Sequence, residues 1–140
     1  MSLIDPSTDF GARVTRRLDT EQVIWLTTTG RSGTPQPNPV WFRWHDGEFL
    51  VFTQPGTPKL ANIAAQPKVS LNLNSTPSGG DVVVLTGTAR VDETPVPAAE
   101  LDAFVAKYTD GLAELGMSRE KFFADYAVVL RITPERVRGF

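Results

Sequence analysis

Three side chains that could bind a phosphate group lie close together near the middle of the sequence. Thr53 ends an apolar run, and Lys59 and Asn62 fall within the first turns of a helix-forming stretch that follows Thr57-Pro58. The first N–H groups of a helix have no partner within the helix, and the helix dipole makes this end positive. A hydroxyl, an ammonium group and a helix start together indicate a phosphate-binding site.

Large aromatic residues are concentrated just before this segment, in Pro39-Val40-Trp41-Phe42-Arg43-Trp44. In an extended strand Val40, Phe42 and Trp44 share one face, whereas Trp41 and Arg43 share the other. A flat conjugated ring could lie along such a surface. An aromatic strand beside a phosphate site suits a flavin-like ligand.

These residues also have ordinary structural explanations. Taken alone, Trp41 and Phe42 are more often residues of a core or a dimer interface than contacts of a ligand ring. Lys59 alone is more often a solvated residue at a helix start. Its position is unfavourable in the helix dipole, however, and this gives a ligand role extra weight. The residues by themselves leave both interpretations open.

The composition excludes most other catalytic chemistry. The chain has no cysteine and a single histidine, His45, which lies in a predicted turn. Most catalytic triads and hydrolytic zinc sites are therefore impossible, and we expect catalysis to use a bound organic cofactor and no metal. Solvent, Tyr108, Tyr126 and His45 are all possible proton donors, so no catalytic residue is assigned.

Charge and hydropathy narrow the possible partners. Lys and Arg total 14 and Asp and Glu total 16, so no broad positive field exists to attract nucleic acid. No apolar stretch approaches the roughly 18 residues of a membrane span, and the first ten residues do not resemble a secretion signal. We expect a cytoplasmic protein with neither nucleic-acid nor membrane partners.

The elements that must position the phosphate and ring sites are short. The chain of 140 residues predicts a single domain over 1–140, and its 11 glycines and 11 prolines indicate many turns. Asp5 is expected to cap a first amphipathic helix. Its Arg13, Arg16 and Arg17 are most simply a solvated face, with contact to an anionic ligand tail as the alternative. Further helices are predicted over 59–65, 97–108 and 118–123. Six strands are predicted over 22–29, 36–44, 48–53, 68–74, 81–91 and 127–133.

Local signals specify how these strands connect. Asp46-Gly47, between two apolar runs, predicts a tight hairpin. Gly87 is expected at a bulge or bend, and Pro134 is expected to end the last strand. Four of the strands are apolar on both faces, which an open sheet with one solvated face would not require. The pattern favours a mainly β, mostly antiparallel and nearly closed barrel with peripheral helices.

The order of these features resembles a known family. The residues that carry the resemblance are Trp25-Leu26-Thr27-Thr28, Gly33 before Pro35, Pro39-Val40-Trp41-Phe42, Asp46-Gly47, Thr53, Lys59-x-x-Asn62-Ile63, Pro67-x-Val69 and Val83-x-Leu85-x-Gly87-x-Ala89. Together they look like the pyridoxamine 5′-phosphate oxidase-like split β-barrel superfamily. More closely, they look like its actinobacterial flavin/deazaflavin branch, whose enzymes use coenzyme F420. The match covers residues 21–91 strongly and the remainder loosely.

This resemblance implies a six-stranded antiparallel split barrel of the FMN-binding type. It also implies a homodimer with cofactor sites at the interface between subunits. By analogy, Pro39, Val40, Trp41 and Phe42 would flank the ring, and Thr53, Gln54, Thr57, Pro58, Lys59 and Asn62 would surround the phosphate. The parent oxidases use a C-terminal Trp/Arg-Leu segment that this sequence lacks, so oxidation of vitamin B6 is not expected.

The expected function is an F420-dependent oxidoreductase that transfers a hydride between the deazaflavin and a small unsaturated organic substrate. One alternative is an FMN-dependent oxidoreductase with the same fold. A second alternative is a non-catalytic protein that binds or sequesters a cofactor. The sequence does not identify the physiological substrate or the residues that a partner subunit would contribute.

Overall fold

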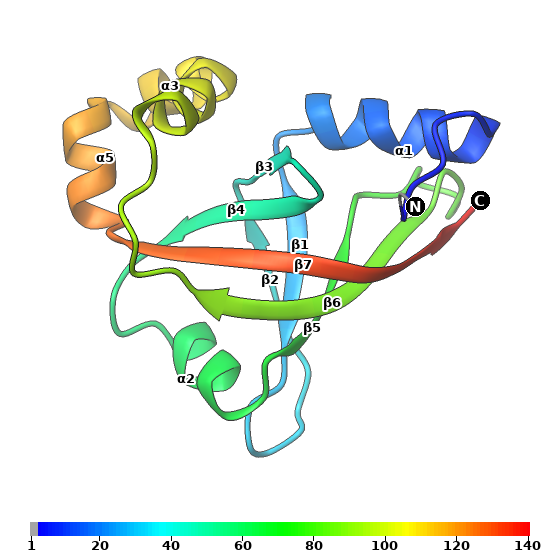
Figure 1. Ribbon diagram of the computed structural model, residues 1–140, viewed down its shortest axis with the longest axis horizontal. Coiled ribbons are helices and arrows are strands. Elements are labelled where there is room, and N and C mark those ends of the chain that lie inside the picture. The colour runs from blue at the N-terminus through cyan, green and yellow to red at the C-terminus, as the bar shows by residue number, and fades with distance from the viewer. Residues whose placement is uncertain (1–2) are drawn as a thin grey trace.

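The computed structural model describes residues 3–140, which form one curled antiparallel sheet with helices around it (Figure 1). The order of strands across the sheet is β2-β1-β5-β6-β7-β4-β3. Their bounds are β1 Ile24–Thr28, β2 Gln36–Val40, β3 Arg43–His45, β4 Glu48–Thr53, β5 Lys68–Asn72, β6 Val83–Val91 and β7 Val128–Gly139. The sheet is so strongly curled that β1 and β2 run across the direction of β4 and β7 in Figure 1. The prediction of a mainly β antiparallel fold with peripheral helices is confirmed.

Among the described residues, five helices lie around the sheet. Their bounds are α1 Asp9–Thr20, α2 Pro58–Ala65, α3 Ala98–Lys107, α4 Thr109–Leu115 and α5 Arg119–Asp125. In Figure 1, α2 lies at the opposite end of the sheet from α3 and α5, and α1 lies beside the end of β7. The sequence analysis missed α4. No helix within residues 3–140 is long and apolar enough to cross a membrane.

The predicted strand over 36–44 is interrupted at Trp41 and Phe42, so the sheet has seven strands rather than six. The interruption arises because the backbone of Phe42 forms hydrogen bonds with side chains and not with a neighbouring strand. Its N–H donates to the hydroxyl of Tyr108 at 2.8 Å, and its carbonyl accepts from Tyr108 at 3.0 Å and from Lys107 at 2.8 Å. The edge strands β2 and β3 are consecutive in the chain, so this short link connects the two edges of the curled sheet.

The last strand continues through Pro134 to Gly139, whereas the sequence analysis ended it at the proline. Pro134 lies opposite Gly87, where the β6–β7 register shifts between Thr86 and Gly87. The missing N–H of a proline is tolerated at such an irregularity. A Cβ on Gly87 would lie 2.2 Å from the Thr133 oxygen, so glycine is required for the close approach of the strands. The predicted irregularity at Gly87 is confirmed.

Three further local predictions have different outcomes. The turn at Asp46-Gly47 is confirmed, since β3 pairs with β4 and both turn residues have positive φ, 51° and 78°. The first helix is capped by Thr8 rather than Asp5, because the Thr8 hydroxyl accepts from the Gly11 N–H. Arg17 is also not on a solvated face: it is 9% exposed and donates to the backbone oxygens of Asn74 and Asp81.

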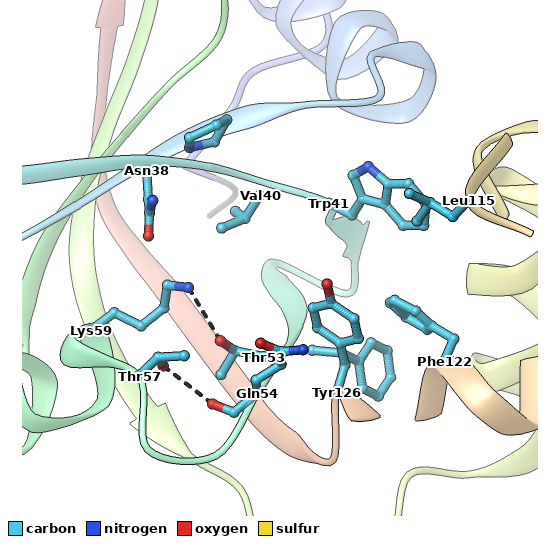
Figure 2. A pocket seen from close by; sticks show the side chains of 12 residues that line it. Asn38, Val40, Trp41, Thr53, Gln54, Thr57, Lys59, Leu115, Phe122 and Tyr126 are labelled. Carbon is cyan, nitrogen blue, oxygen red and sulfur yellow. Dashed lines mark hydrogen bonds between the residues drawn. The ribbon is translucent and has the colours of Figure 1, made fainter. Parts of the chain in front are cut away.

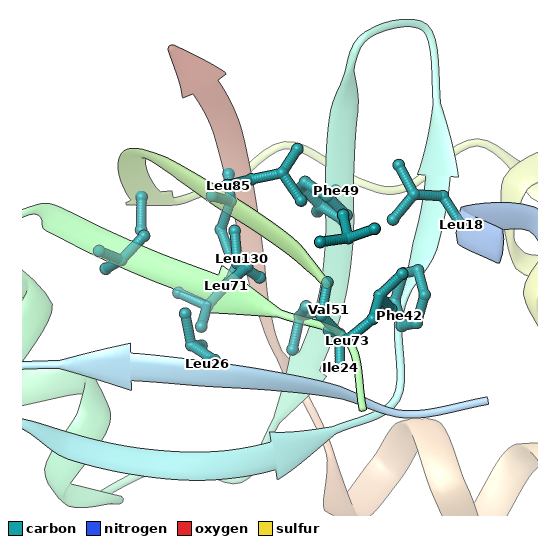
Figure 3. Packing of buried hydrophobic residues seen from close by; sticks show 14 of the residues in the cluster. Leu18, Ile24, Leu26, Phe42, Phe49, Val51, Leu71, Leu73, Leu85 and Leu130 are labelled. Atoms are coloured by element: carbon teal, nitrogen blue, oxygen red, sulfur yellow. The ribbon is translucent and has the colours of Figure 1, made fainter. Parts of the chain in front are cut away.

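The strand β4 separates two hydrophobic cores. Phe49 and Val51 point into the larger core inside the curled sheet, where they meet residues such as Leu71, Leu85 and Leu130 (Figure 3). Leu50 and Phe52 point the other way, into a second core formed with α3, α4 and α5. This second core explains why the strand is apolar on both faces. It also attaches the helical segment 98–125 next to the link formed by Trp41 and Phe42.

Candidate functional site

A cavity of about 400 Å³ opens between β2, the end of β4, the start of α2 and the helices α4 and α5. Its volume lies in the range of small-molecule sites, about 300 to 1,000 Å³. The lining residues are Asn38, Pro39, Val40, Trp41, Phe52, Thr53, Gln54, Thr57, Lys59, Leu115, Phe122 and Tyr126. Figure 2 shows that polar side chains gather on the Lys59 side and aromatic ones on the Trp41 side. The cavity therefore has a polar half and an aromatic half.

Lys59 carries the charge of the polar half. Its Nζ donates to the Thr53 hydroxyl at 3.2 Å, and within residues 3–140 no carboxylate lies close enough to form an ion pair with it. Burial lowers the pKa of Lys59, because the ammonium form loses hydration without gaining an opposite charge. An anionic ligand would supply the missing partner.

The start of α2 lies beside Lys59 and has no side-chain cap. Thr57 occupies the N-cap position, but its hydroxyl donates to the Gln54 carbonyl at 3.2 Å and accepts no bond from the helix. Pro58 follows at the first helical position, where its lack of an N–H costs nothing. The first turn contains no acidic residue. The positive end of the helix dipole is therefore not neutralised locally and favours a bound anion.

The aromatic half is formed by residues distant in sequence. The Trp41 ring stacks on the Tyr108 ring at 4.4 Å and an angle of 8°, and lies 5.6 Å from the Phe122 ring. Phe122 in turn stacks against Tyr126 at 4.6 Å. A Cβ on Gly111 would lie 2.8 Å from the Trp41 ring, so a glycine in α4 allows the helix to approach the indole. Trp41 is thereby fixed as one wall of the cavity.

The structure brings together most residues predicted to bind the cofactor. Seven of the ten line the large cavity: Pro39, Val40, Trp41, Thr53, Gln54, Thr57 and Lys59. Pro58 and Asn62 line a second, adjacent cavity of about 250 Å³. Asn62 is held there by a bond from its Nδ2 to the Thr28 hydroxyl at 3.0 Å.

Phe42 is the exception. It is fully buried in the larger core and lines neither cavity. The geometry therefore gives no support to the prediction that Phe42 flanks a ligand ring, because its side chain lies on the core face of the chain and that of Trp41 on the opposite face. Trp41 faces the cavity, whereas Phe42 packs against Phe49 at 5.9 Å.

Sequence reasoning also missed several lining residues. Asn38 and Phe52 belong to segments already identified, and Tyr126 was named only as a possible proton donor. Leu115 and Phe122 come from the helical segment near the C-terminal end of the chain. The four-residue spacing of Phe122 and Tyr126 was the available signal, since this spacing places two rings on one face of a helix. Nothing local indicated which strand that face would meet.

The three proton-donor candidates occupy different environments. The Tyr108 hydroxyl is buried between the Phe42 backbone and the Gln22 carbonyl, to which it donates at 2.7 Å, and burial raises its pKa. His45 lies in the β3–β4 hairpin and lines other depressions of the surface. Tyr126 lines the large cavity, and Figure 2 shows its hydroxyl directed toward Val40 and Trp41. Only Tyr126 of the three is placed to meet a ligand in this cavity.

Comparisons with known proteins are consistent with the geometry. The family model described as pyridoxamine 5′-phosphate oxidase matches residues 10–140. No curated protein matches the sequence significantly.

Solved structures share the fold at low identity. A putative pyridoxamine 5′-phosphate oxidase from Listeria innocua is 17% identical, with 91% of this chain and 94% of that one covered and a TM-score of 0.69. A protein described as an F420 reductase is 21% identical, with 88% and 94% covered and a TM-score of 0.67. The heme storage protein HutZ from Vibrio cholerae is 13% identical, with 99% and 95% covered and a TM-score of 0.70. At these identities the likeness concerns the fold alone.

Proposed function

Because this chain belongs to the pyridoxamine 5′-phosphate oxidase family and has its split-barrel fold, we propose that the large cavity binds a flavin-like cofactor, specifically the deazaflavin coenzyme F420. The proposed reaction is hydride transfer between this cofactor and a small unsaturated organic substrate. The observation that carries the proposal is Lys59, a half-buried ammonium without a carboxylate partner within residues 3–140, beside an aromatic wall.

The two halves of the cavity match the two ends of such a cofactor. Lys59, the Thr53 hydroxyl and the start of α2 would hold the phosphate, since each offers a donor or positive potential. Val40 and Trp41 would lie against the ring, with Phe122 and Tyr126 extending the aromatic wall beside Trp41. The stacking of Trp41 on Tyr108 fixes the indole before a ligand arrives, so little side-chain entropy is lost on binding.

The protein's own contribution to the reaction is to orient the reactants and to supply a proton. When bound, the reduced deazaflavin supplies a hydride, the two-electron equivalent that adds to one carbon of the substrate double bond. Tyr126 would donate its phenolic proton to the charge that develops on the substrate, and solvent would return that proton afterwards. Trp41 and Phe122 would exclude water from the reacting atoms.

We also propose that the protein functions as a homodimer and that a second copy completes the site. Leu115, on the rim of the cavity, is 56% exposed although it is a large apolar side chain. In such a dimer the second subunit would cover Leu115 and enclose the ring. Sedimentation equilibrium should give twice the mass of the chain, and a monomer at micromolar concentration would contradict this proposal.

Fluorescence titration with F420 tests the cofactor assignment. We expect binding at micromolar concentration and a loss of about 1.5 to 3 kcal/mol for Lys59→Ala, about ten- to more than hundredfold in Kd, because a charge-assisted bond to phosphate is removed. Lys121→Ala is the matched control: this exposed lysine pairs with Asp125 away from the cavity, so its Kd should be unchanged.

Several results would redirect the proposal. Equal affinities for wild type and Lys59→Ala would refute the role of this lysine. A purified protein that retains FMN through gel filtration would favour the FMN-dependent alternative. Tight binding of F420 without turnover of enones or quinones would favour the non-catalytic alternative.

A further inference from the structure

A cavity of about 470 Å³ lies apart from the proposed cofactor site, where α1, β3 and α3 meet. The two helices flank β3 in Figure 1. None of the residues that line this α1–α3 cavity lines either cavity beside Lys59. Its volume lies in the range of small-molecule sites, about 300 to 1,000 Å³.

Arg43, in β3, lines the α1–α3 cavity with donors that no protein group uses. Its side chain is only 19% exposed, yet none of its guanidinium nitrogens donates a hydrogen bond within residues 3–140. A carboxylate oxygen of Glu100 lies 3.5 Å from its Nη1, but both oxygens of Glu100 already accept bonds from Arg131. Because a mostly buried cation without its own acceptor is unfavourable, an anionic ligand would stabilise Arg43.

The other charges around the cavity also favour an anion. Lys107 lines it as a second cation, held in place by its bond to the Phe42 carbonyl and its position over the Phe42 ring. Burial lowers the pKa of Lys107 to about 8, so the ammonium form still dominates at neutral pH. Asp19 is the only carboxylate among the described residues that line the cavity, and protonation of His45 would only add positive charge. Two cations facing one carboxylate leave a balance that one negative charge would neutralise.

The rest of the lining is mainly apolar and includes an aromatic ring. Trp44 packs against Phe49 with ring centroids 4.7 Å apart and also lines the cavity. On the side of α3 the lining residues are Ala103 and Ala106, whose small side chains leave space that larger ones would fill. A flat ligand could lie beside the indole while its carboxylate accepts the two parallel bonds that a guanidinium offers.

We infer that the α1–α3 cavity is a second ligand site, which binds a small carboxylate with a flat apolar body through Arg43. This inference goes beyond the proposed function, because it needs no cofactor in the large cavity. The two sites are nevertheless close in the chain, since Trp41 lines the large cavity and Arg43 lines this one.

A proton–nitrogen NMR titration tests the second site, with benzoate as the probe and benzamide as a neutral comparison of the same shape. The indole N–H signal of Trp44 is the local readout. Arg43→Met removes the guanidinium and keeps an apolar side chain. Ala106→Leu fills the cavity from an exposed position of α3 without changing a charge. Ala99→Leu is its matched control, because Ala99 is an exposed residue of the same helix outside the lining.

We expect wild type to bind benzoate with a Kd of about 1 mM or lower, and at least about tenfold more tightly than benzamide. Arg43→Met and Ala106→Leu should each raise the Kd of benzoate at least about tenfold, since one removes the bidentate bonds and the other removes the space. Ala99→Leu should stay within about twofold of wild type, and so should Lys59→Ala, which changes only the large cavity.

No saturation of the Trp44 signal by about 20 mM benzoate, or equal affinities for benzoate and benzamide, would overturn the inference. An unchanged Kd in Ala106→Leu would also overturn it, and this variant keeps the test decisive where Arg43→Met folds poorly. A loss of binding in Lys59→Ala would place benzoate in the large cavity and equally refute the second site. The cofactor titration is a separate measurement, so failure of the second site leaves the proposed function standing.

Discussion

Two lysines of this protein have a lowered pKa, and their surroundings separate a structural role from a binding role. Burial lowers the pKa of Lys107 to about 8, but its Nζ donates to the Phe42 carbonyl at 2.8 Å and lies 3.7 Å from the centre of the Phe42 ring. Lys59 is also desolvated, yet its only hydrogen-bond partner within residues 3–140 is the Thr53 hydroxyl. Lys107 thus stabilises the link at Phe42, and Lys59 remains available to a ligand.

Tyr108 and Tyr126 also divide into a structural residue and a residue available to a ligand, and this division gives a prediction. Tyr126→Phe should lower kcat by about a hundredfold or more, because general acids typically contribute this much, while the Kd of the cofactor changes little. Single-turnover kinetics of substrate reduction, combined with the fluorescence titration, separates the two quantities.

Tyr108→Phe is the matched control for Tyr126→Phe. It should lower the free energy of unfolding by about 1 to 3 kcal/mol, since the Tyr108 hydroxyl joins the Phe42 backbone to the Gln22 carbonyl. Its kcat should stay near that of wild type wherever the protein is folded. An unchanged kcat in Tyr126→Phe would exclude Tyr126 as the proton donor.

At the scale of elements, the helical segment that contains α3, α4 and α5 supplies half of the site. Its inner face packs on Leu50 and Phe52 of β4, and its outer end places Phe122 and Tyr126 opposite Val40. The predictions of α3 from apolar spacing and of α5 from the cap at Ser118 were sound, but neither signal indicated the second core. Helix periodicity identifies the buried face of a helix and not the partner that this face meets.

The pairing of β6 with β7 depends on Gly87, and this predicts a loss of stability. In Gly87→Ala the new Cβ would lie 2.2 Å from the Thr133 oxygen and 2.7 Å from the Pro134 Cα. Both neighbours are backbone, so the strands must separate, at a cost of about 1 to 3 kcal/mol. Urea unfolding followed by circular dichroism measures the change.

Thr86→Ala provides the comparison for Gly87→Ala, since Thr86 is the exposed residue on the other side of the register shift. Its effect should stay within about 0.5 kcal/mol. A Gly87→Ala protein as stable as Thr86→Ala would mean that the strand pair can absorb a side chain at this position.

At the scale of the whole molecule, Arg131 joins the sheet to the helical segment. Its side chain is 9% exposed, and two of its nitrogens donate to the two oxygens of Glu100 in α3 at 3.0 and 2.9 Å. Its Nε donates to Asp92, which precedes that helix, at 3.2 Å. The bidentate pair orients α3, and with it the aromatic half of the cavity, relative to β7.

Arg131→Met should therefore lower the free energy of unfolding by about 3 to 5 kcal/mol, because the carboxylates of Glu100 and Asp92 lose their buried partner. Arg90→Met, which removes an exposed arginine beside Glu48, should cost less than about 1 kcal/mol. Thermal and urea unfolding of both variants provide the measurement.

The contribution of the Arg131–Glu100 pair to the free energy of unfolding depends on pH in a definite direction. The hydrogen bonds from Arg131 hold the pKa of Glu100 below its ordinary value of 4.5. The resulting stabilisation is complete above that value and is lost as pH falls through the lowered pKa of the folded state. Stability measured from neutral pH down to the acid range should fall more steeply in wild type than in Arg131→Met. Parallel curves would show that other carboxylates dominate acid unfolding.

The sequence by itself determined the local features of this protein. Alternating apolar residues gave the strands, Asp46-Gly47 gave the hairpin, and Gly87 marked the irregular pairing. The polar half of the cavity was also predictable, because Thr53, Thr57 and Lys59 are neighbours in the chain and hence neighbours in space. Side-chain type and short-range spacing are sufficient for such features, since they depend on backbone geometry within a few residues.

The tertiary structure alone decided the rest of the site. Trp41 and Phe42 are adjacent and chemically alike, yet one faces the cavity and the other is buried in the core, and only the fold decides which face of the chain meets the cavity. Leu115, Phe122 and Tyr126 reach the cavity only because β4 has a second apolar face for the helices to cover. Contacts between residues 60 or more positions apart depend on packing complementarity, which local periodicity does not encode.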